Sequence, residues 1–122
     1  MRHKLIDLLE QSPVIPAVKD EDALRRALDC ESRAVFLLGG DLLRIGQWIA
    51  TTHEAEKQAI VHLDLVGGLA PKEVAVDWLQ QQGADGLIST RPHLIRRGRE
   101  NKMLTVLRVF AIDSKAVSNL GK

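Results

Sequence analysis

The sequence contains no tyrosine and few other aromatic residues, since Phe, Trp and Tyr together make up only 3% of its 122 residues. Proteins that hold single-stranded nucleic acid without sequence preference usually stack the bases on aromatic side chains. The aromatic residues present fall at apolar positions of predicted helices and strands, namely Phe36, Trp48, Trp78 and Phe110. Recognition of nucleic acid by base stacking is therefore poorly supported.

Cysteine is nearly absent as well, because Cys30 is the only one in the sequence. This excludes an internal disulfide and any zinc site built from several cysteines, and it fits a reducing, cytoplasmic setting. No apolar run approaches the roughly 20 residues that a membrane-spanning helix needs. The basic residues at 1–4 are not followed by the long apolar region of a secretion signal, so we expect no membrane partner.

Neither sign of charge dominates, because 17 Lys and Arg residues are balanced by 16 Asp and Glu residues. The overall charge therefore indicates no partner, and electrostatic arguments must be local. The histidines are scattered through the chain without a metal-binding spacing such as HExxH. A GxSxG elbow is also absent, and Cys30 has no evident histidine partner. We therefore expect no metal, no cofactor and no catalytic nucleophile.

Short apolar runs alternate with helical patterns along the whole chain. Strands are predicted at 14–18, 34–38, 86–89 and 105–110, and in the stretch from Ala59 that carries His62 and Asp64. Helices are predicted at 20–29, from Asp41 to about His53 or Lys57, from Pro71 to Gly83 and at 92–101, with short helices at 3–11 and from Asp113 to Leu120. This alternation predicts a single parallel α/β domain over residues 1–122.

Two architectures are compatible with five such strands. One is an open, doubly wound sheet, and the other is a TIM-barrel-like sheet with about five of the eight βα units of a complete barrel. In both, ligands bind at the carboxyl ends of the strands. That rule selects Lys19, Gly39-Gly40, His62, Asp64, the segment 89–91 and the region from Arg108 to Asp113.

Asp64 and His62 lie on the same face of the third predicted strand, where the strand ends. A carboxylate at this position can orient a hydroxyl-bearing ligand or pair with an arginine. The alternative is a structural aspartate that caps the turn or pairs with a strand neighbour such as Lys19 or Arg91. For His62, a hydrogen-bonded interior residue is the commoner role and a general base the rarer one.

Ser89-Thr90-Arg91 ends the fourth predicted strand just before Pro92 begins a helix. Backbone N–H groups, hydroxyls and a guanidinium meet there, which favours an anion site over simple capping of the helix.

The helix that follows is rich in arginine. The basic residues of this segment are Arg91, Arg96, Arg97, Arg99 and Lys102, with Glu100 as the only acid. Such a surface suits a phosphate backbone, although a solvated helix face is the commoner cause of this pattern.

Several of these motifs together resemble the glycerol uptake operon antiterminator regulatory family. The similarity runs in order from about residue 13 to residue 117, and its strings are VIPAV at 14–18, VHLDL at 61–65, GLISTR at 86–91 and RVF at 108–110. The resemblance implies a cytoplasmic regulator with a TIM-barrel-like fold, not an enzyme. It further implies a response to glycerol 3-phosphate and action on leader mRNA to prevent transcription termination.

The resemblance carries over Asp64, Arg91 and Arg108 as ligand-binding candidates, and strand-end position adds Lys19, His62 and Ser89. Arg96, Arg97, Arg99 and Lys102 are the RNA-binding candidates. Family members continue with further strands that carry an L-P-G turn and a glycine-rich turn, so the chain resembles a form shortened after the fifth strand. Five barrel strands leave two unpaired edges, which predicts self-association into homo-oligomers. The same strand-end residues also leave open a small enzyme that acts on a phosphorylated polyol or sugar.

Overall fold

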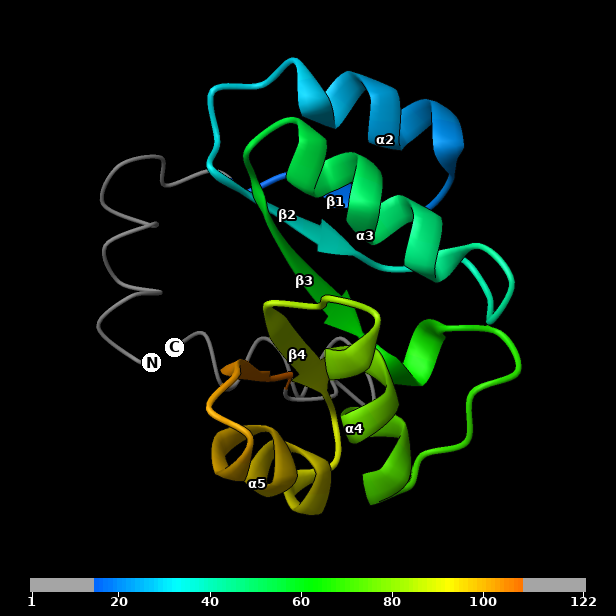
Figure 1. Cartoon of the computed structure of the whole chain (residues 1–122), viewed down its shortest axis with the longest axis vertical. Helices are drawn as coiled ribbons and strands as arrows, with labels where there is room; N and C mark the ends of the chain where they lie inside the picture. The colour runs from blue at the N-terminus through cyan, green and yellow to red at the C-terminus, as the bar shows by residue number, and fades with distance from the viewer. Residues whose placement is uncertain (1–14, 109–122) are drawn as a thin grey trace, which may run out of the picture.

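The computed structural model describes residues 15–108 and has five parallel strands alternating with helices (Figure 1). The strands are β1 (Ala17–Val18), β2 (Ala34–Leu37), β3 (Gln58–His62), β4 (Gly86–Ser89) and β5 (Leu104–Leu107). The helices are α2 (Glu21–Leu28), α3 (Ile45–Glu54), α4 (Glu73–Gln81) and α5 (Pro92–Glu100), and a 3₁₀ helix, η1 (Leu63–Leu65), follows β3. The helices predicted at 3–11 and 113–120 lie outside the described residues.

The strands lie side by side in the order β1-β2-β3-β4-β5, which is also their order in the chain. In a doubly wound sheet the order of the strands reverses at a switch point. The described sheet has no such reversal, so the doubly wound alternative is wrong. A sequential order is that of consecutive units of a (β/α)₈ barrel. The predicted partial barrel is therefore confirmed. β1 and β5 are the edges of the described sheet, while the expected self-association stays a prediction.

The four described helices share one apolar core with one face of the sheet. Alternate strand residues point into it, such as Val35 and Leu37 from β2 and Val61 from β3, all fully buried. The opposite face carries a second, smaller cluster around Ile60 and Ile88. Helices on a single face are what the outer layer of a barrel requires, and the second cluster lies on the face that would become the interior.

Local sequence explains where the helices begin and end. The Asp20 side chain accepts a 2.8 Å hydrogen bond from the Ala23 N–H and caps α2. Pro92 occupies the first turn of α5, where its missing N–H leaves no hydrogen bond unmade. Gly83 follows α4 with φ +101, a left-handed conformation that glycine adopts without steric strain. These three predicted boundaries are confirmed.

The segment after β2 differs from its prediction, because α3 begins at Ile45 and not directly after Asp41. The Asp41 side chain caps the turn that leads into α3, accepting from the Leu43 and Arg44 N–H groups at 2.9 and 3.0 Å. Asp41 also forms a parallel bridge with Gly67 in the loop after β3. The Gly67 N–H donates to the Gly40 carbonyl at 2.9 Å, and the Leu42 N–H donates to the Gly67 carbonyl at 3.0 Å. The loops after β2 and β3 are thus joined through their backbones, which a sequence pattern does not reveal.

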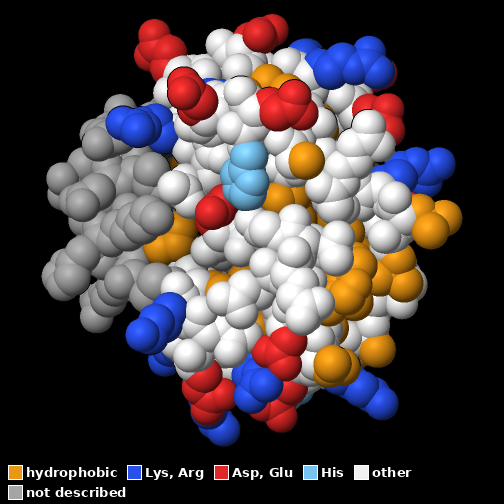
Figure 2. All heavy atoms as spheres, in the orientation of Figure 1, with side chains coloured by type: hydrophobic (Ala, Val, Ile, Leu, Met, Phe, Trp, Pro, Cys, Tyr) orange, Lys and Arg blue, Asp and Glu red, His pale blue; other side chains and the backbone are white. Residues whose placement is uncertain are grey.

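The surface beside this bridge is apolar. Leu42, Val74 and Trp78 line a cavity of about 240 Å³ between the loop after β2 and α4. Leu43, in the same turn as Leu42, is 91% exposed. Figure 2 shows hydrophobic side chains gathered on the right of this face, over the loops that follow β2 and β3. No helix within residues 15–108 is long and apolar enough to cross a membrane.

Candidate functional site

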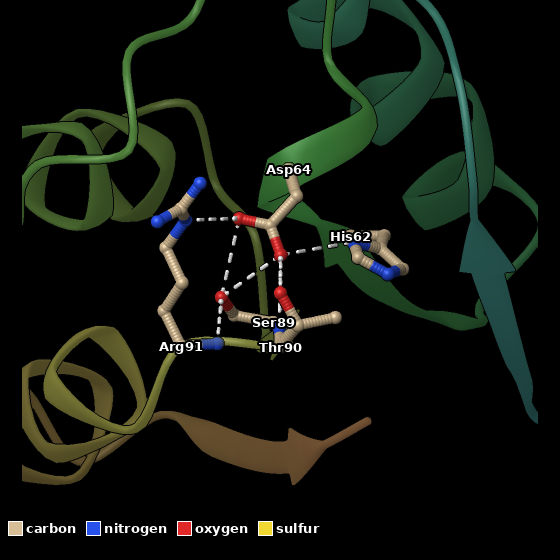
Figure 3. A network of polar contacts seen from close by, with 5 residues as sticks. All are labelled: His62, Asp64, Ser89, Thr90 and Arg91. Atoms are coloured by element: carbon tan, nitrogen blue, oxygen red, sulfur yellow. Dashed lines mark hydrogen bonds and ion pairs between the residues drawn. The ribbon is translucent and has the colours of Figure 1, made fainter. Parts of the chain in front are cut away.

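The carboxylate of Asp64 is the centre of a polar network at the carboxyl ends of β3 and β4 (Figure 3). The Thr90 N–H and hydroxyl donate to Asp64 Oδ2 at 2.9 and 3.0 Å. The Ser89 hydroxyl donates to the same carboxylate, at 3.1 Å to Oδ2 and 3.3 Å to Oδ1. Arg91 Nε lies 3.7 Å from Oδ1. The two strand ends are therefore joined by one side chain.

Two strand-to-helix turns place these groups together. β3 and β4 are hydrogen-bonded neighbours in the sheet, with His62 beside Ile88. β3 ends at His62 and the chain enters η1, which directs Asp64 towards the end of β4. Arg91 is the N-cap residue of α5, and its N–H donates to the Ser89 hydroxyl at 3.1 Å. The donors that surround Asp64 thus lie just before the N-terminus of α5, the positive end of that helix.

His62 lies beside this network and is 2% exposed. Its Nδ1 is 4.0 Å from Asp64 Oδ2, too far for a hydrogen bond, and has no hydrogen-bond partner among the described residues. Burial lowers the pKa of His62 below its ordinary value of 6.5, Asp64 offsets part of that shift, and Arg108 adds to it. The imidazole is therefore neutral at pH 7. Its burial agrees with the expected interior position, but its Nδ1 lacks the hydrogen bond expected of such a residue among residues 15–108.

This burial predicts that the protein loses stability in mild acid. The folded state resists protonation of His62, while the unfolded chain takes up that proton below about pH 6.5. The contribution of His62 is therefore fully present above pH 6.5 and is lost as the pH falls, by at most about 1.4 kcal/mol per pH unit. Urea unfolding at pH 7.5 and 5.5 measures this, and His62→Gln should flatten the dependence. The exposed His93, changed to Gln, should leave it unchanged; equal effects of the two variants would contradict the prediction.

A small apolar cavity lies beside His62 on the other face of the sheet from the four helices. It measures about 200 Å³ and is lined by Phe36, Leu38, His62, Ile88, Val106 and Arg108. The Arg108 N–H donates to the Ser89 carbonyl at 2.9 Å, which holds this arginine next to the end of β4. β3, β4 and β5 are neighbours, so the structure brings His62, Ser89 and Arg108 to one end of the sheet.

Lys19 is the ligand-binding candidate that the structure does not bring to this network. It follows β1, and β2 separates that strand from β3. The backbone carbonyl of Lys19 instead lies close to Gly39, where an added Cβ would stand 2.7 Å from it. Asp64 therefore pairs with Arg91 and not with Lys19, although both pairings were consistent with the sequence.

The basic segment of α5 contains one arginine with a structural partner. Arg97 donates to the Asp77 carboxylate through Nε at 3.0 Å and Nη2 at 2.8 Å, and thereby joins α5 to α4. Asn101 donates to the same carboxylate at 2.7 Å. These hydrogen bonds hold the pKa of Asp77 at about 2. Among the described residues, Arg96, Arg99 and Lys102 are exposed, whereas Arg97 already pairs with Asp77.

Thr90 is the participant that the sequence alone undervalued. Its backbone N–H and its hydroxyl supply two of the hydrogen bonds to Asp64, whereas the sequence placed Thr90 in the candidate anion site but did not single it out as a ligand-binding residue. The signal was present in the Ser-Thr pair at the end of a buried strand. Residues 15–108 contain no group of three or more His, Cys, Asp or Glu side chains that could hold a metal ion.

A sequence family and several known proteins are similar to this chain in sequence or fold. A sequence model of the family described as glycerol-3-phosphate responsive antiterminator matches residues 14–122. The chain is 35% identical over 119 residues to YgcP of Escherichia coli (strain K12), which is described as uncharacterized. A glycerol uptake operon antiterminator regulatory protein from Listeria monocytogenes has a similar crystal structure, with 29% identity and a TM-score of 0.77. A glycerol uptake operon antiterminator-related protein from Thermotoga maritima is 33% identical, with a TM-score of 0.73.

These relatives are longer than the chain. The match to YgcP covers 97% of this chain and 62% of YgcP. The structural matches each cover 86% of this chain, and 57% of the Listeria protein or 59% of the Thermotoga protein. The chain thus spans about three fifths of the length of the proteins it matches.

Proposed function

This chain belongs to the glycerol-3-phosphate responsive antiterminator family, and from that premise we propose that it regulates transcription termination in the cytoplasm. In this proposal it binds the leader mRNA of a glycerol operon and responds to glycerol 3-phosphate. The family is named for a regulatory activity, and we propose no catalytic reaction for the strand-end residues.

One arrangement carries the proposal. The start of α5 gathers a backbone N–H, two hydroxyls and the Arg91 guanidinium, the groups that bind phosphate in proteins. Later residues of the same segment, Arg96, Arg99 and Lys102, expose positive charge to solvent. A small phosphate ester and a nucleic-acid backbone would therefore bind to two parts of one helical segment. His62 Nδ1 lies 4.0 Å from Asp64 beside the first part, and the Arg108 N–H donates to the Ser89 carbonyl there.

The proposal is tested by RNA binding. Fluorescence anisotropy with a labelled glycerol-operon leader RNA measures the affinity of the protein with and without glycerol 3-phosphate, and glycerol serves as the control ligand. We expect binding that glycerol 3-phosphate changes and glycerol does not. Absence of binding under both conditions would contradict the proposal.

The exposed cations of α5 and of the turn that follows it should set the salt dependence of this binding. Each neutralised phosphate of a single strand contributes about 0.7 to the slope of log affinity against log salt concentration. The combined variant Arg96→Gln, Arg99→Gln, Lys102→Gln should therefore make the slope shallower by about 2. Arg97 is left in place because its loss would break the contact with Asp77.

A second triple variant provides the matched control, because it removes the same charge elsewhere. Arg25, Arg26 and Arg33 are exposed and lie in α2 or before β2. Their replacement by Gln should lower affinity only through the change in net charge and leave most of the slope intact. Equal slopes for the two triple variants would show that the basic segment of α5 is a solvated face.

A further inference from the structure

We propose that the start of α5 is a phosphate site which the protein's own Asp64 carboxylate fills until a phosphate ester displaces it. The inference rests on the proposed response to glycerol 3-phosphate, but it reverses the role expected for Asp64. In this view Asp64 is an internal competitor of the ligand and not one of its binding groups.

The hydrogen bonds of Asp64 are those that a bound phosphate would receive. The Thr90 N–H, the Thr90 hydroxyl and the Ser89 hydroxyl all donate to the carboxylate, within 2.9–3.3 Å. Arg91 supplies positive charge at 3.7 Å. α5 has nine residues, and Ser89 and Thr90 stand directly before its N-cap residue Arg91, so the carboxylate that they bind lies close to the positive end of the helix. The anionic group of Asp64 therefore already occupies the donors (Figure 3).

His62 provides independent evidence that the carboxylate fills the site incompletely. Its Nδ1 points towards the cluster, is buried, and lacks a hydrogen-bond partner among residues 15–108. The nearest carboxylate oxygen is 4.0 Å away, and both oxygens of Asp64 already accept hydrogen bonds. A buried polar atom without a partner is unfavourable. A phosphate monoester presents three terminal oxygens, so it can bind the donors of α5 and still offer one oxygen to His62.

The site is also open enough for exchange. The Arg91 side chain is 51% exposed and that of Asp64 is 16% exposed, so the network borders solvent. Asp64 lies in η1, a helix of only three residues, and the Val66 N–H closes that turn with one hydrogen bond of 3.2 Å to the Leu63 carbonyl. Displacement of the carboxylate therefore requires movement of a short element and not of a strand.

The variant Asp64→Asn tests the inference, because Asn keeps the size of the side chain and one acceptor oxygen but removes the competing charge. Isothermal titration calorimetry with glycerol 3-phosphate, inorganic phosphate and glycerol compares it with the unchanged protein. We expect the variant to bind glycerol 3-phosphate and phosphate about tenfold more tightly, which corresponds to about 1.4 kcal/mol. Thermal unfolding checks that the variant is folded, and Asp64→Ser serves as a second variant if it is not.

The outcomes are distinct. Weaker or equal binding of glycerol 3-phosphate by folded Asp64→Asn would overturn the inference, since a residue that holds the ligand behaves in that way. Detectable binding of neither phosphate compound by either protein would overturn it too, as would a gain for glycerol alone. A gain with both phosphate compounds supports a site for the phosphate group, and a gain with the ester alone supports one that also requires the glycerol part.

Arginine variants locate the bound ligand. In the Asp64→Asn background, Arg91→Gln should weaken binding of glycerol 3-phosphate roughly tenfold, while Arg96→Gln, later on the same helix, should not. Equal effects of the two would place the ligand elsewhere. The calorimetry contains no RNA, so its failure is separable from that of the proposed function: RNA binding without an effect of Asp64→Asn would overturn only the inference made here.

Discussion

Replacing Leu87 with alanine should lower the free energy of unfolding by about 2–5 kcal/mol, because the change leaves a cavity in the centre of the main core. Leu87 is fully buried on β4, which lies between β3 and β5. Gly98 of α5 packs closely against it, so that a Cβ added at Gly98 would stand 3.1 Å from Leu87 Cδ2. Urea unfolding measures the effect as a lower midpoint with an unchanged slope.

Leu43 offers the same substitution at a surface position. The residue is 91% exposed in the turn after β2, so Leu43→Ala should change stability by less than about 0.5 kcal/mol. A large loss at Leu43 would mean that this surface is covered in solution. A small loss at Leu87 would contradict the assignment of the helix-covered face of the sheet as the main core.

Adding a single methyl group at Gly86 should destabilise the protein by about 1–3 kcal/mol, through overpacking between three strands. A Cβ there would lie 2.9 Å from Leu104 Cβ and 3.1 Å from Ile60 Cγ1. It would also lie 3.1 Å from the Leu104 carbonyl oxygen, which the backbone of β5 holds in place. The flanking strands must therefore move apart, and the expected result of Gly86→Ala is a lower unfolding midpoint in urea or heat.

Gly46→Ala is the control, because the same methyl group should be harmless there. Its Cβ would lie 2.7 Å from Gln82 Oε1, the far end of a flexible side chain that can turn away. Gly46 lies in the first turn of α3, where alanine is the better helix former by up to about 1 kcal/mol. We therefore expect opposite signs for the two glycine substitutions. A loss of stability at both positions would show that close packing at Gly86 is not the cause.

The parallel βα arrangement could be predicted because its signals are local. Apolar runs, Asp20 as a cap, Pro92 at a helix start and Gly83 after a helix each act within a few residues. The choice between a doubly wound sheet and a barrel could not be made in this way. It depends on which strands are neighbours, and the same helices and strands can be arranged in either order.

The candidate site shows the same division between local and long-range information. The rule that ligands bind at strand ends selected His62, Asp64, Ser89 and Arg91, and the structure brings these four side chains together. Their partners could not be assigned, because Asp64 and Thr90 are 26 residues apart and meet only after β3 and β4 pair. The roles of these residues in binding remain predictions.

Arg97 illustrates what a composition-based argument does not show about single residues. On composition alone the arginines of α5 are equivalent RNA-binding candidates. The helical period, however, places them on different sides of the helix. Arg97 faces α4 and pairs with Asp77, while Arg96 and Arg99 face solvent. Asp77 lies on the preceding helix, 20 residues earlier, and no local pattern links the two.

The backbone bridge between Asp41 and Gly67 also constrains how this sequence can vary. The loops after β2 and β3 are far apart in the chain, yet two hydrogen bonds fix their relative positions. An insertion or deletion in one loop would move its half of the bridge out of register. Related sequences should therefore change the lengths of these two loops together or not at all. The two loops would then evolve as one unit, although they are separate segments of the sequence.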